Sequence, residues 1–158
     1  TNRLAYTIYE VSGNIFTPAV PKTSSLQEVV SGDAVEFRYW NVELDETDSY
    51  ELVDATKTAT VYALFYLDGN KLKVDYGPCP PGAILSGSGV RNASGVTTKV
   101  LADNVSTDSN NNVGAFSHTT LNGIGTGCVR INIILTDPES KESVRVMTAA
   151  LLRNIWPG

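Results

Sequence analysis

The sequence predicts an α+β fold: an N-terminal helix followed by a mostly antiparallel β-sheet in one domain. Apolar residues first recur at helical spacing and then, further along the chain, at every second position. The chain has 158 residues, of which 42% are hydrophobic and 18% charged. That length and composition suit one globular core rather than two.

The helix is predicted at the N-terminus. Leu4, Ile8 and Val11 fall at i, i+4 and i+7 and form an apolar stripe, and Gly13-Asn14 is a plausible helix stop. Three turns are too few to be stable alone. The helix is therefore expected either to pack on the domain or to be the end of a longer helix that has been removed.

Period-two alternation begins after residue 33. Val35, Phe37 and Tyr39 alternate with more polar neighbours, which predicts a strand. Residues 58–67 are rich in β-branched and aromatic residues, and Asp68-Gly69-Asn70 then turns the chain into residues 71–75, which predicts a hairpin. Residues 77–95 are rich in Gly and Pro and are predicted to be irregular.

The second half contains the clearest hairpin. Residues 97–105 fit a strand or a helical turn equally well, and residues 113–121 predict a strand. The last hairpin turns at Asp137-Pro138-Glu139-Ser140. Its two apolar faces consist of Val129, Ile131, Ile133 and Leu135 on the first strand and Val144, Val146, Thr148, Ala150 and Leu152 on the second.

The two cysteines, Cys79 and Cys128, lie 49 positions apart and do not form a CxxC motif. A disulfide between them would close a loop worth roughly 4 kcal/mol and would indicate an oxidising compartment. Two unrelated buried thiols are the alternative.

Composition argues against several functions. A net charge of −5 repels phosphate backbones, so no direct nucleic-acid partner is expected. His118 is the only histidine and no nucleophile motif accompanies it, so neither a catalytic triad nor a histidine-rich metal site is expected within one chain. A hydrolase that uses paired carboxylates stays formally open, but nothing in the spacing supports it. We therefore predict that the chain is not an enzyme.

Two acidic segments are candidates for calcium, which prefers oxygen ligands. Six acids lie between Glu43 and Asp54, and a solvated loop is the simpler interpretation of them. The second candidate is weaker, because Val113 stands where a calcium loop needs Gly. Its ligands would be Asp103, Asp108, Asn110 and Asn112. No other cofactor is predicted.

The last third of the chain resembles the end of larger minor type IV pilins and type II secretion pseudopilins. The segment from Cys128 to Asp137, a polar turn, and a final strand ending in Leu152-Arg153-Asn154 carry this resemblance. Weaker likenesses lie at residues 33–37, 61–72 and 100–105, in the order that the family has.

The resemblance implies a structural or assembly-priming minor subunit of a type IV pilus-like filament, or alternatively a minor pseudopilin. Residues 1–14 would be the end of a truncated spine helix, packed through Leu4, Ile8 and Val11, and residues 15–158 the β-rich head. Its partners would be other pilin or pseudopilin subunits and, through the missing helix, the inner membrane. The head would lie in the periplasm and then in an extracellular or periplasmic filament.

A secreted adhesion or ligand-binding β-domain is the alternative of another class. It predicts that residues 1–12 pack fully on their own domain, whereas the filament interpretation predicts a helix whose start projects outward. Neither interpretation involves catalysis.

Overall fold

The protein is an all-β sandwich in the computed structural model, which describes residues 5–22, 27–39, 43–44, 50–51, 61–108, 113–121, 124–125 and 128–151. Across these residues there is no helix. The predicted α+β class is therefore wrong, although the antiparallel sheets are confirmed. The strands are β1 (Ala5–Ser12), β2 (Ile15–Pro18), β3 (Gln27–Gly32), β4 (Ala34–Tyr39), β5 (Glu43–Leu44), β6 (Tyr50–Glu51), β7 (Val61–Asp68), β8 (Lys71–Pro78), β9 (Thr97–Asp103), β10 (Val105–Ser106), β11 (Phe116–Leu121), β12 (Ile124–Gly125), β13 (Cys128–Thr136) and β14 (Ser143–Leu151).

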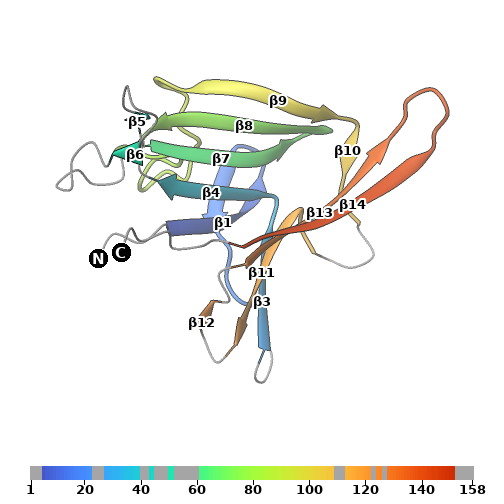
Figure 1. The fold of residues 1–158 in the computed structure, drawn as a ribbon, viewed down its shortest axis with the longest axis horizontal. Helices are drawn as coiled ribbons and strands as arrows, with labels where there is room; N and C mark the ends of the chain where they lie inside the picture. The colour runs from blue at the N-terminus through green and yellow to red at the C-terminus, as the bar shows by residue number, and fades with distance from the viewer. Residues whose placement is uncertain are drawn as a thin grey trace.

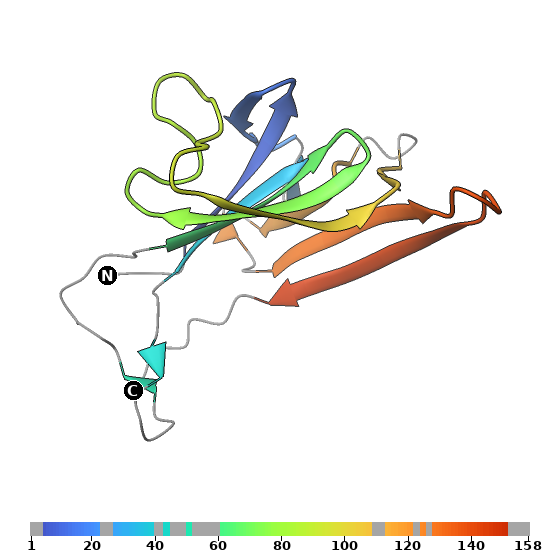
Figure 2. The same cartoon turned by 90° about the horizontal axis from the view of Figure 1, so that it is seen from above.

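Two sheets form the sandwich (Figures 1 and 2). Sheet A has the order β2-β1-β4-β7-β8-β9, and in sheet B the strands β3, β11, β13 and β14 lie in that order, with β10 and β12 as short additions. The chain passes from sheet B to sheet A between β3 and β4, and back again between β9 and β10. In both views the β13–β14 hairpin projects beyond the rest of the sandwich.

The segment predicted to be a helix is strand β1, inside sheet A. It pairs with β2 on one side and with β4 on the other. Ile8 is buried on the face toward sheet B, and its neighbour Tyr9 is buried on the opposite face. A strand that is covered on both faces carries apolar residues on both faces and does not show period-two alternation. Some of its apolar residues can therefore fall at helical spacing by chance. Gly13-Asn14 is a hairpin turn rather than a helix stop.

The main core lies between the two sheets. Phe116 and Val129 from sheet B meet Ile8 and Val35 from sheet A, and all four are almost completely buried. The inner face of the β13–β14 hairpin extends this core, since Ile133 pairs with Val146. The predicted hairpins at residues 68–70 and 137–140 are both confirmed.

A third layer covers the outer face of sheet A. Residues 79–96 leave β8, cross this face and return to β9, as the yellow-green segment in Figure 2 shows. Ala83, Ile84 and Val96 from this segment pack against Tyr62 and the other buried residues of the outer face. We call residues 79–96 the outer loop. Its irregular backbone was predicted, but its packing on the sheet was not.

Truncation of Phe116 is expected to test the inter-sheet core. Phe116→Ala should lower the free energy of unfolding by about 3–5 kcal/mol, because it removes a buried ring and leaves a cavity. Val20→Ala, at an exposed position after β2, is the control and should change it by less than about 0.5 kcal/mol. Denaturant unfolding followed by circular dichroism measures both values, and similar losses in the two variants would contradict this core.

Candidate functional site

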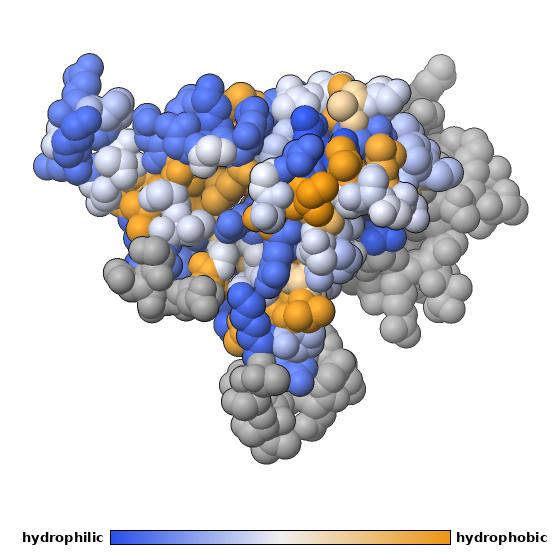
Figure 3. All heavy atoms as spheres, turned by 180° about the vertical axis from the view of Figure 1, so that it is seen from behind, coloured by the Kyte–Doolittle hydropathy of each residue, from blue (hydrophilic) through white to orange (hydrophobic). Residues whose placement is uncertain are grey.

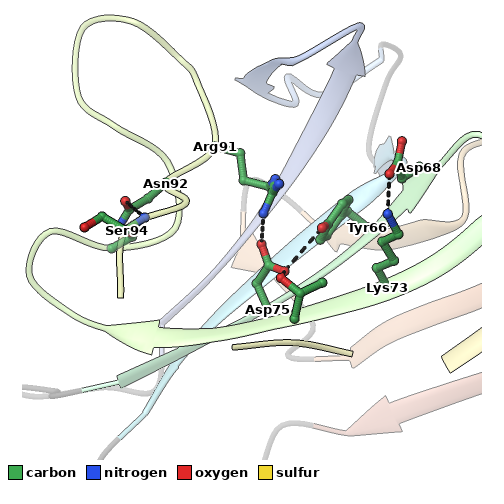
Figure 4. A network of polar contacts seen from close by, with 9 residues as sticks. Tyr66, Asp68, Lys73, Asp75, Arg91, Asn92 and Ser94 are labelled. Carbon is green, nitrogen blue, oxygen red and sulfur yellow. Dashed lines mark hydrogen bonds and ion pairs between the residues drawn. The ribbon is translucent and has the colours of Figure 1, made fainter. Parts of the chain in front are cut away.

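A network of polar side chains lies under the outer loop (Figure 4). It is built around two buried carboxylates, Glu36 on β4 and Asp75 on β8. Both point to the outer face of sheet A, where Tyr62 and Tyr66 of β7 lie between them in the strand order. Charged residues in mid-strand usually face solvent, so this burial depends on the outer loop that covers them.

Asp75 is fully buried, and its carboxylate accepts two hydrogen bonds and forms one ion pair. Its Oδ1 accepts hydrogen bonds from Tyr66 Oη at 3.2 Å and from Thr98 Oγ1 at 2.6 Å. Its Oδ2 lies 2.5 Å from Arg91 Nη1, and Arg91 belongs to the outer loop. The guanidinium also lies 5.2 Å from the centre of the Tyr66 ring, within cation–π range. The ion pair therefore joins the outer loop to β8.

Glu36 has a similar but separate set of partners. Tyr9 Oη donates a hydrogen bond to its Oε2 at 2.8 Å, and Arg38 Nε lies 3.0 Å from its Oε1. Arg38 Nη2 donates in turn to Thr7 Oγ1 at 3.0 Å. Each carboxylate thus has one arginine and at least one tyrosine, which offsets the cost of burying its charge.

Tyr62 completes the group, yet its hydroxyl lacks a hydrogen-bond partner among the described residues. Its side chain is 0% exposed. The ring fits beside Gly77, the cross-strand partner of Tyr62, because a Cβ at residue 77 would lie 2.7 Å from the hydroxyl. Burial, followed by the negative charges of Asp75 and Glu36, raises the pKa of Tyr62 to about 12.

One backbone contact joins the outer loop to β2, and further hydrogen bonds connect residues within the loop. The amide of Phe16 on β2 donates to Gly89 O at 2.8 Å, and the amide of Asn92 donates to Ala83 O at 2.7 Å. Asn92 is buried and its side-chain amide donates to Gly82 O. With its oxygens taken by Arg91, Tyr66 and Thr98, Asp75 is arranged to hold the loop rather than to reach a substrate.

The structure does not show the predicted disulfide, and both cysteines are free thiols in it. Cys79 packs with the buried residues on the outer face of sheet A. Cys128 begins β13 in sheet B and lies near Tyr6, whose pKa is raised first by burial and then by this thiol. Cys79 thus directly follows β8 of sheet A, whereas Cys128 belongs to sheet B.

The calcium candidates do not form a site in the described part of the chain. Asp103 lies 3.4 Å from Lys71 Nζ, and Asp108 forms an ion pair with Arg145. Asn110, Asn112 and most of the run from Glu43 to Asp54 lie outside the described residues. Among the residues that the structure describes, no group of three or more His, Cys, Asp or Glu side chains could hold a metal ion.

The surface is hollowed at the end of the sandwich where β1 turns into β2 and β7 into β8. One hollow, of about 730 Å³, is lined by Asp33 and Asp68 among others, and a neighbouring one by Asp33 and Asp108. Each acid is already engaged: Asp33 accepts the Ala115 amide at 3.0 Å, and Asp68 lies 2.5 Å from Lys73 Nζ. The acids that line the two hollows therefore already have partners within the chain.

The remaining predicted residues are structural. Ile8 lies in the inter-sheet core and Val11 at the outer face of sheet A, while Leu4 is outside the described residues. His118 lies on β11 with its ring 5.3 Å from that of Tyr6, and burial lowers its pKa. The sequence did not predict the buried carboxylates of the outer face, because Glu36 and Asp75 occupy polar positions in strands with period-two alternation.

Removal of single tyrosine hydroxyls should distinguish the hydrogen-bonded hydroxyl of Tyr66 from the hydroxyl of Tyr62, which has no partner among the described residues. Tyr66→Phe deletes a hydrogen bond to a buried carboxylate and is expected to lower the free energy of unfolding by about 1–2 kcal/mol. Tyr62→Phe deletes an unpaired buried hydroxyl and should leave it unchanged or raise it by up to ~1 kcal/mol. Urea unfolding of both variants gives the comparison. Equal losses would show that the Tyr62 hydroxyl has a partner.

Alkaline pH should unfold the protein through the same tyrosines. Burial and the charge of Asp75 raise the pKa of Tyr66, like that of Tyr62, to about 12, against about 10 in an unfolded chain. The neutral phenols therefore stabilise the fold fully below pH ~10, and this stabilisation is lost as the pH rises toward ~12. Phenolate absorbance should rise together with the loss of circular dichroism. Ionisation of all tyrosines near their ordinary pKa in the folded protein would contradict this.

Comparison with known proteins does not assign a family. No protein-family model, curated protein or solved structure matches the chain. Among the described residues, no helix is long and apolar enough to span a membrane. The functional proposal therefore depends on the fold and contacts described above.

Proposed function

We propose that this chain is a non-catalytic β-sandwich module that binds another protein chain along the free edge of β14. One observation carries the proposal. In the described part of the chain, β14 pairs only with β13, in nine consecutive residue pairs. Val146 is the one partly buried side chain among those described in β14, while Val144 and Met147 are 64% and 69% exposed.

An edge strand of this kind is a ready template for a further strand, because its outward N–H and C=O groups have no sheet partner. Proteins usually block such an edge with proline, a bulge or charged side chains. β14 has no proline, glycine or bulge, and its one charged residue, Arg145, is paired with Asp108.

One edge strand of sheet A, β9, differs from β14. β9 pairs with β8 across a register shift between Leu72 and Lys73, and it carries Lys99 and Asp103. A bulge and charges are the protection that β14 lacks. This difference supports β14 rather than β9 as the binding edge.

The position of the hairpin suits the same role. It projects from the sandwich, so a partner strand could approach without meeting the outer loop (Figures 1 and 2). Seen from behind, polar residues cover the tip of the projecting part, and apolar residues gather beside it (Figure 3). Exposed apolar residues next to a free sheet edge are a common feature of protein-binding surfaces.

Within this class we favour a secreted adhesion or binding domain. That class predicts that residues 1–12 pack on their own domain, and residues 5–12 support it, because they form a strand between β2 and β4 with Ile8 and Tyr9 buried. The second candidate is the head of a minor pilin or pseudopilin. It is supported by the sequence resemblance of residues 128–154, which include the β13–β14 hairpin. For both candidates, the free thiols remove the argument for export that a disulfide would have provided.

Site-specific photo-crosslinking in the cells that make the protein tests the binding edge. A photoreactive residue at Met147 should give covalent products with another protein chain, because β14 is in contact with its partner. The same residue at exposed Ser88, in the outer loop, is the control and should give few such products. Absence of products at position 147, or equal yields at both positions, would contradict the proposal.

A further inference from the structure

We infer that the partner of β14 is β14 of a second copy of this chain, joined antiparallel across a two-fold axis at Met147. This inference rests on the proposed function, since it names the partner of the same edge. A symmetric pair of this kind would join two copies of sheet B into one continuous sheet. Isologous two-fold contacts are the commonest way in which soluble proteins form homo-oligomers.

The register follows from the length of the strand and the direction of its side chains. β14 runs from Ser143 to Leu151, so its central residue is Met147. Centring the axis there pairs all nine residues of each copy, whereas any shift along the strand loses pairs. Centring also places inner-face residues opposite inner-face residues, because 144 then faces 150 and 146 faces 148. The apolar inner faces of both hairpins become continuous.

The charges are compatible with this register. Arg145 would stand opposite Ala149 of the second copy, so no two like charges face each other across the new interface. The two arginines would lie four residues apart along the strands, roughly 13 Å, beyond the Debye length of about 8 Å at physiological salt. Each is also paired with Asp108 of its own chain.

The pairs themselves are favourable. Val146 would face Thr148, which joins two β-branched residues across strands, and Met147 would face its own copy on the axis. Met147 is the most exposed large apolar side chain among those described, and this contact would cover it. The net charge of −5 on each copy opposes association, so pairing should strengthen as salt screens that repulsion.

Charge complementation at position 147 tests the inference, because only a residue on the axis faces itself. Met147→Lys and Met147→Glu should each weaken dimerisation of the purified full chain roughly tenfold or more, since like charges then meet at the centre. An equimolar mixture of the two variants should recover a dimer. Ser140→Lys, in the exposed hairpin turn, should leave the association constant unchanged. Sedimentation velocity over a range of protein concentrations at physiological salt measures all four samples.

The outcomes distinguish this inference from the proposed function. A wild-type chain that stays monomeric at every concentration, or a mixture no better than either variant alone, would overturn pairing with a second copy. A monomeric chain that still cross-links through position 147 to a different protein would overturn this inference and retain the binding edge. Dimerisation that neither Met147 variant changes would place the interface elsewhere and overturn the inference too.

Discussion

The two sheets depend on a close contact between backbone segments at Gly32. A Cβ at this residue would lie 2.0 Å from the carbonyl oxygen of Tyr9, and a Cβ at Gly114 would lie 2.4 Å from the carbonyl oxygen of Gly32. Three segments of chain therefore meet where no side chain fits, as β3 of sheet B leads into β4 of sheet A. Asp33 fixes the corner, because its carboxylate accepts the Ala115 amide and its carbonyl accepts the Leu67 amide.

Because sheet B packs on one face of sheet A at this corner, the two faces of sheet A have different surroundings. Its inner face meets Phe116 and the other core residues of sheet B, and its outer face carries the buried polar group under the outer loop. The ion pair between Asp75 and Arg91 joins that loop to the sheet. The central strands are covered on both sides, and the side chains with most freedom to meet a partner are those of the edge strands β9 and β14.

The sequence predicted the local features of this fold and missed the ones that depend on tertiary contacts. Hairpin turns such as Asp68-Gly69-Asn70 are set by a few neighbouring residues, so they were found. The N-terminal strand was mistaken for a helix because both of its faces are buried, although Tyr6-Thr7-Ile8-Tyr9 consists of strong strand formers. Burial of Glu36 and Asp75 depends on a loop whose path the sequence does not show. The sequence likewise does not show that Cys79 lies beside sheet A and Cys128 in sheet B.

The central claim is that the outward edge of β14 pairs with β14 of a second copy of the chain, and amide hydrogen exchange tests it most directly. The outward-facing amides of β14 should exchange quickly in dilute protein and become protected as the concentration rises, because a second copy then accepts their hydrogen bonds. Amides of β9, an edge strand of sheet A, should exchange at the same rate at every protein concentration. Exchange in β14 that does not depend on concentration, or equal protection of β9, would contradict the claim.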